Sequence, residues 1–184
     1  MNITKNLTHR ECLGWWLNDN GLIGEGAEIG SAFGQFANRI LTTWQGKKLY
    51  MVDPWREQPD ADYPEATNKV APWDDWYKSC ASIAEHDPRA VLVRKLSAEA
   101  VKEVDAASLD FCYIDANHDY RNVMEDLDAW FSKVKLGGLL GGHDCYDNST
   151  GGQNCHVFSA LRRWTNERNL IFTVTPCTSF WILK

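Results

Sequence analysis

Hydrophobic residues are arranged along the chain in two patterns, one typical of helices and one typical of buried strands. In residues 33–44 the apolar side chains fall three or four positions apart, as on one face of a helix. Residues 48–52, KLYMV, form a short apolar run instead, closed by Asp53-Pro54, as a buried strand is. These criteria predict strands at residues 24–29, 48–52, 90–96, 109–114, 138–141, 170–175 and 179–183. They predict helices at residues 8–19, 33–44, 74–86, 98–104, 120–134 and 157–166.

The order of these elements predicts the fold class. Strands and helices alternate over most of the chain, which is typical of a parallel sheet covered by helices on both faces. The last two strands are joined only by Pro176-Cys177-Thr178. They must run antiparallel, because a parallel connection needs a crossover of about a dozen residues. The sequence therefore predicts an α/β fold of three layers, with a Rossmann-like, doubly wound sheet of seven strands that is parallel except for an antiparallel last strand.

The length of 184 residues fits a single domain, residues 1–184, that opens with an N-terminal helical segment at 1–21. Residues 54–75 interrupt the alternation with a long segment rich in proline, acidic residues and tryptophan. A loop of this length inside a compact domain is usually functional. We therefore expect residues 54–75 to act as a lid over a substrate.

Charge and hydropathy exclude some classes of partner. The 19 basic residues against 25 acidic ones give a net charge of −6, and the basic residues form no block. This argues against nucleic acid, because phosphate binding needs clustered Lys and Arg. No apolar run approaches transmembrane length, and the first residues lack the apolar core of a signal peptide. The expectation is a cytoplasmic protein that does not bind a membrane.

The residues with chemical potential gather at one edge of the predicted sheet. In an open parallel sheet, ligands bind beyond the carboxyl ends of the strands. The polar residues and glycines that follow the first five strands are Glu28, Gly30, Ser31, Gly34, Asp53, Ser97, Asp115, Asn117, His118, His143 and Asp144. Each alone is an ordinary loop residue. Together they predict a ligand site.

The first of these loops favours a cofactor without phosphate. Its spacing, Glu28-x-Gly30-x-x-x-Gly34, differs from the G-x-G-x-x-G turn that binds a dinucleotide, and Glu28 would repel a pyrophosphate. S-adenosylmethionine carries a sulfonium, an ammonium and no phosphate. Asp53 is well placed to accept hydrogen bonds from its ribose hydroxyls. Trp55 is either a packing partner for the adenine or an ordinary packed loop residue.

The chain resembles class I S-adenosylmethionine-dependent methyltransferases over essentially its whole length. The stretch E-I-G-S-A-F-G at residues 28–34 matches the first motif of that family, and V-D-P at 52–54 the second. Residues 110–146 are similar to a small-molecule group with the signature I-D-G-x-H-x-Y, D-L-x-x-W and G-G-x-x-x-x-H-D. The resemblance covers Ile114-Asp115, His118, Tyr120, Asp126-Leu127, Trp130, Gly137-Gly138 and His143-Asp144. The chain departs from it at Ala116, where the group has glycine.

This resemblance implies a cofactor site and a catalytic site. The cofactor would bind Glu28, Gly30, Ser31, Gly34, Asp53, Trp55, Ser97 and Asp115. Asp115 and Asp144 would converge on a cation such as Mg²⁺. Relatives with such a metal site carry a pair of acids where this chain has His143-Asp144, and a histidine ligand would favour a transition metal. Without a metal, His118 or His143 would be the general base, beside Asp144.

The resemblance further implies methylation of a hydroxyl group on a small molecule, such as a sugar or another natural product. A nicotinamide-dependent oxidoreductase, a non-catalytic S-adenosylmethionine-binding protein and a hydroxylase are the alternatives. The methyl acceptor itself cannot be read from the sequence. Trp15 and Trp16 point in different directions on the first helix, so one of them is free to make a homodimer contact.

Overall fold

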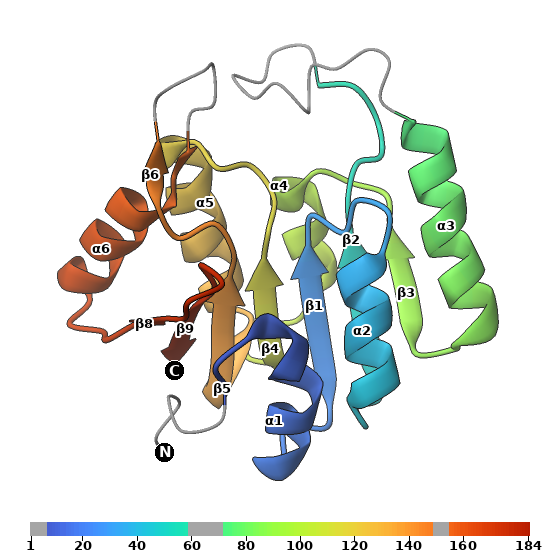
Figure 1. Ribbon diagram of the computed structural model, residues 1–184, viewed down its shortest axis with the longest axis horizontal. Coiled ribbons are helices and arrows are strands. Elements are labelled where there is room, and N and C mark those ends of the chain that lie inside the picture. The colour runs from blue at the N-terminus through green and yellow to red at the C-terminus, as the bar shows by residue number, and fades with distance from the viewer. Residues whose placement is uncertain (1–6, 59–71, 149–154) are drawn as a thin grey trace.

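The computed structural model describes residues 7–58, 72–148 and 155–184, and these form a seven-stranded sheet between two layers of helices (Figure 1). The strand order is β3-β2-β1-β4-β5-β9-β8. The strands are β1 (Glu25–Ile29), β2 (Lys48–Val52), β3 (Ala90–Val93), β4 (Leu109–Ile114), β5 (Val134–Gly142), β8 (Thr173–Val174) and β9 (Phe180–Leu183). The first five strands in this order, β3, β2, β1, β4 and β5, run parallel to one another. Strand β9 is antiparallel to both β5 and β8. The predicted fold class, with its reversed last strand, is confirmed.

The helices divide between the two faces of the sheet (Figure 1). The first face carries the 3-10 turn η2 (Arg10–Cys12), α1 (Leu13–Asp19), α2 (Gln35–Thr43) and α3 (Trp73–His86). The second carries α4 (Ser97–Ala100), the turn η3 (Val101–Glu103), α5 (Tyr120–Phe131) and α6 (Val157–Glu167). A separate antiparallel pair, β6 (Asp147–Asn148) and β7 (Cys155–His156), stands at the edge that holds the carboxyl ends of the parallel strands.

Each face of the sheet has its own hydrophobic core, and β4 supplies both. Its side chains alternate, so Phe111 and Tyr113 join the core beneath α1 and α2. Cys112 and Ile114 join the core beneath α5 and α6. All six residues of β4 are buried, as expected of a central parallel strand. Strand β4 is buried on both faces as far as Ile114, and Asp115 follows it at the edge of the sheet.

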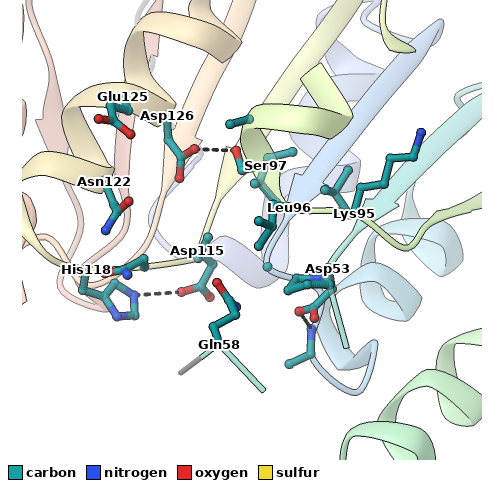
Figure 2. Close-up of a pocket in the computed structure, with 18 of the residues that line it drawn as sticks. Asp53, Gln58, Lys95, Leu96, Ser97, Asp115, His118, Asn122, Glu125 and Asp126 are labelled. Atoms are coloured by element: carbon teal, nitrogen blue, oxygen red, sulfur yellow. Dashed lines mark hydrogen bonds and ion pairs between the residues drawn. The ribbon is translucent and has the colours of Figure 1, made fainter. Parts of the chain in front are cut away.

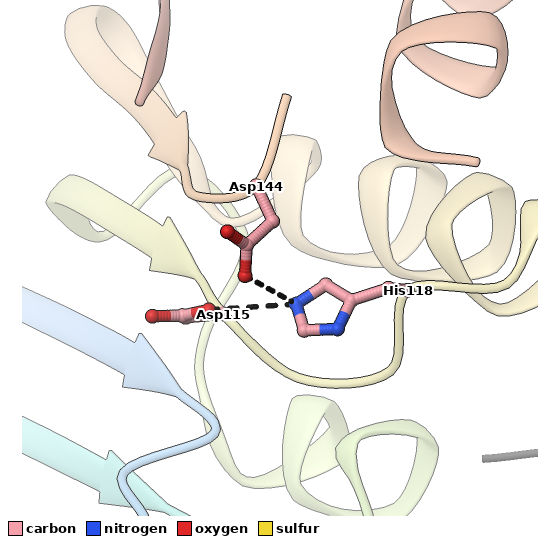
Figure 3. Close-up of side chains that lie close together, drawn as sticks. All are labelled: Asp115, His118 and Asp144. Atoms are coloured by element: carbon pink, nitrogen blue, oxygen red, sulfur yellow. Dashed lines mark ion pairs between the residues drawn. The ribbon is translucent and has the colours of Figure 1, made fainter. Parts of the chain in front are cut away.

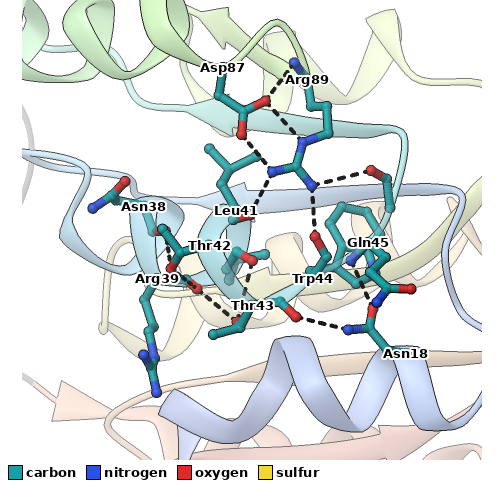
Figure 4. A network of polar contacts seen from close by, with 12 residues as sticks. Asn18, Asn38, Arg39, Leu41, Thr42, Thr43, Trp44, Gln45, Asp87 and Arg89 are labelled. Carbon is teal, nitrogen blue, oxygen red and sulfur yellow. Dashed lines mark hydrogen bonds and ion pairs between the residues drawn. The ribbon is translucent and has the colours of Figure 1, made fainter.

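Hydrogen bonds to carbonyl groups anchor the C-terminal end of α2 (Figure 4). Arg89 donates to the carbonyls of Leu41 and Trp44 at 2.5 and 2.7 Å, and its guanidinium is held by Asp87. Asn18 of α1 donates to the Thr43 carbonyl at 2.8 Å. These donors satisfy carbonyls that the last turn of a helix leaves without partners. The opposite end of α2, which faces the site, is thereby held in place.

The structure differs from the sequence prediction in several boundaries. The helix predicted at 120–134 ends at Phe131, and β5 already begins at Val134, where it pairs with Leu109 before a register shift. The strand predicted at 90–96 ends at Val93, because the Lys95 amide turns back to the Val93 carbonyl. Strand β8 is shorter than predicted, and the β6–β7 pair was not predicted at all.

Two further expectations concern the N-terminal helix and the lid. Trp16 is buried, whereas Trp15 is half exposed beneath the Arg39 guanidinium, so the two tryptophans do point apart. Most of the expected lid at 54–75 lies outside the described residues, and its last residues, from Trp73 on, are the first turn of α3. In the described part of the chain, no helix is long and apolar enough to cross a membrane.

Candidate functional site

A cavity of about 620 Å³ opens beyond the carboxyl ends of the parallel strands. Its walls come from the loops after β1 to β5, from the start of α3 and from one side of α5. Figure 2 shows the part of the wall that follows β2, β3 and β4 together with α5. This volume lies within the range of small-molecule and cofactor sites. Seven of the residues selected from the sequence line it: Gly30, Asp53, Ser97, Asp115, Asn117, His118 and Asp144. Glu28, Ser31, Gly34, Trp55 and His143 are not among the residues that line it.

The loop between β1 and α2 needs glycine at two positions. Gly30 has φ +90°, and a Cβ there would lie 2.1 Å from the carbonyl oxygen of Asp115. Only glycine combines this conformation with so close an approach of the β4 backbone. Gly34, with φ +83°, directly precedes α2 and is packed against Ile83 and Cys80 of α3. The backbone of this loop therefore forms the floor of the cavity.

Glu28 and Ser31 lie buried beneath that floor. Glu28 is 2% exposed and Ser31 is 4% exposed. Among the described residues, neither Glu28 Oε2 nor Ser31 Oγ has a hydrogen-bond partner. Burial, with smaller contributions from the charges of Asp115 and Asp53, raises the pKa of Glu28 to about 8 against the opposing effects of Ser31 and Arg10. Buried polar atoms without partners are uncommon and point to a polar ligand.

Asp53 follows β2 and is oriented by two backbone amides. Its Oδ2 accepts from the Ala32 amide at 2.9 Å, and its Oδ1 accepts from the Trp55 amide at 2.8 Å. Burial raises the pKa of Asp53 despite these two hydrogen bonds. Each carboxylate oxygen can accept one further bond. Asp53 thus offers the cavity a fixed pair of acceptors for a vicinal diol.

Trp55 does not occupy the position expected of an adenine-stacking residue. It is fully buried, its indole Nε1 donates to the Ala32 carbonyl at 2.6 Å, and its ring packs edge-on against Tyr77. This agrees with the simpler alternative of an ordinary packed residue. Trp55 holds the loop after β2 against the loop after β1, which positions Asp53.

Three side chains from two loops converge at the opposite wall of the cavity (Figure 3). His118 Nε2 lies 3.5 Å from Asp115 Oδ1 and 3.3 Å from Asp144 Oδ2. Ligand atoms of all three residues lie within 4.8 Å of one another, which is compatible with a shared metal ion. Arg10 of η2 contributes a positive charge here, because its Nη1 lies 3.1 Å from Asp115 Oδ2. This contact joins residues 105 positions apart, and no local sequence pattern indicates it.

Asp144 is held in an unusual conformation. Its φ of +52° is rare for a residue other than glycine, and such strain is often found at functional sites. Burial would raise its pKa, but the hydrogen bond from His143 and the charges of His143, His118 and Arg10 outweigh burial and lower it. His143 Nδ1 lies 3.0 Å from Asp144 Oδ1. His143 therefore orients Asp144 from outside the cavity, and His118 is the histidine that faces the cavity.

Ser97 lines the cavity but is already engaged by its neighbours. It accepts a hydrogen bond from Trp130 Nε1 at 2.8 Å and donates one to Asp126 Oδ1. Burial raises the pKa of Asp126 to about 6, against the effect of that hydrogen bond from Ser97. From the sequence, Asp126 is included only in the family resemblance and is assigned no role in the site. The missed signal is its spacing, since Asn122, Asp126 and Ala129 share one helical side and all line the cavity.

Comparison with known families identifies the family of this chain. The family model described as "Methyltransferase domain" matches residues 27–145, which span β1 to the loop after β5. The chain belongs to the methyltransferase domain family. It is an S-adenosylmethionine-dependent methyltransferase with the class I fold. This membership supports neither the oxidoreductase nor the non-catalytic alternative. No curated protein matches the chain.

Solved structures of methyltransferases share this fold at low sequence identity. A Staphylococcus aureus protein named as a caffeoyl-CoA O-methyltransferase superposes with a TM-score of 0.68 at 11% identity, covering 95% of this chain and 82% of the other. A Bacillus cereus O-methyltransferase in complex with SAH gives 0.62 at 13% identity, covering 97% and 81%. A Geobacter sulfurreducens methyltransferase gives 0.63 at 14% identity, covering 95% and 78%.

The methyltransferase cavity has features that suit S-adenosylmethionine. Asp53 presents acceptors suited to ribose hydroxyls, and the Gly30 loop admits a ligand close to the backbone. The orphaned oxygens of Glu28 and Ser31 lie below that loop. The carboxylates of Asp115 and Asp144 in the cavity wall suit the ammonium and sulfonium groups of this cofactor rather than a pyrophosphate.

Proposed function

We propose that this methyltransferase transfers the methyl group of S-adenosylmethionine to a hydroxyl group of a small molecule, with His118 as the general base. The observation that carries the proposal is the position of His118 Nε2, which lies between the carboxylates of Asp115 and Asp144 in the wall of the same cavity as Asp53. The structural neighbours named as O-methyltransferases support the choice of a hydroxyl acceptor.

The cofactor would lie across the carboxyl ends of β1, β2 and β4. Asp53 would accept hydrogen bonds from the ribose hydroxyls. Gly30 would let the methionine part pass over the loop after β1, toward Asp115. Bound in this way, the cofactor supplies an electrophilic methyl group on its sulfonium.

His118 then has a defined chemical task. A hydroxyl group is almost fully protonated at neutral pH and is a weak nucleophile until its proton is removed. His118 Nε2 would take that proton as the oxygen forms its bond to the methyl carbon and the carbon–sulfur bond breaks. For this, the neutral imidazole must carry its hydrogen on Nδ1 and leave Nε2 unprotonated. Asp115 and Asp144 face the same Nε2, so after the transfer they would accept hydrogen bonds from its new N–H and stabilise the imidazolium. The methyl transfer therefore needs no reactant besides the cofactor and the acceptor, because His118 takes the proton that the hydroxyl group loses.

The cavity wall also offers a surface for the acceptor. Trp73 and Trp76 of α3 line the cavity and pack edge-on at 5.2 Å between ring centroids. Phe33 lies beside Trp76, at 6.2 Å, and is half exposed. Aromatic faces of this kind bind the flat or apolar side of a phenolic ring or a sugar. This arrangement supports a cyclic small molecule as the acceptor.

A divalent metal ion at the same cluster is a second candidate for activating the acceptor. It is favoured by the convergence of Asp115, His118 and Asp144 within 4.8 Å. A bound metal would lower the pKa of a coordinated hydroxyl group, and the mixed oxygen and nitrogen ligands favour Mn²⁺ or Zn²⁺ over Mg²⁺. His118 would then be a ligand and not a base.

Steady-state assays of His118→Gln test these roles. The probes are S-adenosylmethionine with caffeic acid, caffeoyl-CoA and a set of pyranosides, and mass spectrometry of the product distinguishes methylation from hydroxylation. If His118 is the base, kcat falls about 100-fold or more while S-adenosylhomocysteine binding is unchanged. His143→Gln, which leaves His118 in place, should cost less. An unchanged kcat in His118→Gln would refute the assignment. Loss of wild-type activity with EDTA, restored by Mn²⁺, would favour the metal role.

A further inference from the structure

A polar group that the proposed chemistry does not use lies at the end of the cavity formed by α5. It consists of Ser97, Asp126 and Trp130. The indole N–H of Trp130 can only donate, and it donates to Ser97 Oγ. The hydroxyl hydrogen of Ser97 is therefore directed to Asp126 Oδ1. This chain of two hydrogen bonds fixes the orientation of the Asp126 carboxylate.

The second oxygen of that carboxylate remains available. Among the described residues, Asp126 Oδ2 accepts no hydrogen bond and Asp126 forms no salt bridge. The residue is 8% exposed and lines the cavity, so this limited exposure is toward the ligand space. The nearby amide of Asn122 does not satisfy it, because Asn122 Nδ2 donates to Asp119 Oδ2. The α5 end of the cavity thus presents a buried, preoriented acceptor that needs a donor from a ligand.

The position of this acceptor relative to Asp53 indicates which donor. Figure 2 shows Asp53 and Asp126 on opposite sides of Leu96 and Ser97, all facing one space. With the ribose at Asp53, the attached base would extend along the loop after β3 toward Asp126. Adenine carries an exocyclic amine, which is a hydrogen-bond donor, on the edge far from the ribose.

We propose that Asp126 Oδ2 accepts a hydrogen bond from the exocyclic amine of the cofactor adenine, and that Ser97 positions Asp126 for this contact. The inference rests on the cofactor placement given under the proposed function. Asp126 then selects an adenine over a 6-oxopurine, because a carboxylate placed at the purine 6-position repels the carbonyl oxygen of the latter, and the neighbouring N1–H would reach Oδ2 only if the base shifted. Ser97 thereby acts through Asp126 instead of touching the adenine as a donor.

Binding of two ligands to the wild-type protein gives the first test. The ligands are S-adenosylhomocysteine and S-inosylhomocysteine. The first has an amine at the purine 6-position, and the second has a carbonyl there with a hydrogen on the neighbouring N1. Isothermal titration calorimetry at pH 7.5, where Asp126 is ionised, measures both dissociation constants. The adenosyl ligand should bind about 10- to 100-fold more tightly, as a hydrogen bond to a charged group implies. Equal affinities would overturn the inference without recourse to any variant.

Asp126→Asn gives the second test, because the direction of its hydrogen bonds can be predicted. The Ser97 hydroxyl would still donate to Asn Oδ1, so the Asn amide would point its N–H groups into the cavity. A donor there repels the adenine amine and accepts a 6-oxo group as partner. The preference should therefore reverse, with S-inosylhomocysteine the tighter ligand.

Glu125→Gln is the matched control. Glu125 also lines the cavity and loses the same charge in this variant, but it is exposed and pairs with Arg121 at 2.8 Å. The control should keep the wild-type ratio of affinities. If both variants change the ratio alike, a general charge effect is responsible and the inference is overturned. Failure of the wild-type protein to bind S-adenosylhomocysteine would overturn the proposed cofactor placement as well, which separates the two failures.

Discussion

At the scale of single residues, Glu28 lies deepest among the carboxyl groups of the site. It stands at the end of β1, where its neighbours are the β4 and β2 backbones, and one of its oxygens has no hydrogen-bond partner among the described residues. Such a carboxyl group is costly to ionise in the free protein. A positively charged ligand above the loop would offset that cost, so we infer that Glu28 couples cofactor binding to stability.

The stability of the free protein should therefore depend on the ionisation of Glu28. Its pKa is about 8 in the folded protein against an ordinary value of 4.5. The unfolded chain releases the proton first, so the contribution of Glu28 is fully present below pH 4.5 and is lost as the pH rises to about 8. Glu28→Gln should remove this component, so that its free energy of unfolding falls less between pH 5 and pH 9 than that of the wild type.

Urea denaturation at several pH values measures this difference. Glu125→Gln, which changes an exposed carboxyl group, serves as the control and should follow the wild-type curve. If Glu28→Gln and the wild type lose the same free energy between pH 5 and pH 9, Glu28 is not the titrating group.

The sequence predicted those residues of the site that follow a strand. Gly30, Asp53, Asp115, His118 and Asp144 each follow a strand, and the topology rule for parallel sheets brings them together. Arg10 could not be predicted, because its contact with Asp115 crosses 105 positions and depends on how η2 packs. Trp55 was ambiguous for a related reason, since its burial depends on the later packing of Tyr77 against it.

At the scale of elements, the turn from β1 into α2 sets the geometry of the site. Gly30→Ala should destabilise the protein by several kcal/mol, because it adds a Cβ 2.1 Å from the Asp115 carbonyl as well as straining φ. Gly137→Ala isolates the second effect, since Gly137 has φ +79° with no atom within 4 Å of its added Cβ. The control should cost only about 1 kcal/mol.

Urea denaturation of both variants, with S-adenosylhomocysteine titrations, checks this expectation. Equal losses of stability in Gly30→Ala and Gly137→Ala would show that the close approach of β1 and β4 is unimportant. A Gly30→Ala protein that retains full affinity for S-adenosylhomocysteine would contradict the role of this turn in the cofactor site.

The hydrophobic pattern predicted the seven main strands and the helices because each repeats over several residues. It failed where an element is short or depends on distant partners. The β6–β7 pair has two residues in each strand, which is too few for a periodic signal. The early start of β5 was missed because Gly137 and Gly138 interrupt its hydrophobic pattern after only three residues.

At the scale of the whole molecule, two separate cores hold the sheet and leave one edge for chemistry. Each face buries its own set of helices, so the carboxyl ends of β1 to β5 remain fixed relative to one another. Asp53 after β2, the cluster after β4 and β5, and the Asp126 group at α5 share a cavity because of this rigid frame. The homodimer expected at the N-terminal helix stays a prediction, for which half-exposed Trp15 is the first residue to change.

The central claim is that this cavity binds S-adenosylmethionine as the cofactor of methyl transfer, and calorimetric titration tests it most directly. The wild-type protein is titrated with S-adenosylhomocysteine and with NAD⁺, each in the presence of Mg²⁺ and again with EDTA. The account predicts a micromolar dissociation constant for S-adenosylhomocysteine and no binding of NAD⁺. Absence of S-adenosylhomocysteine binding under both conditions, or tighter binding of NAD⁺, would contradict it.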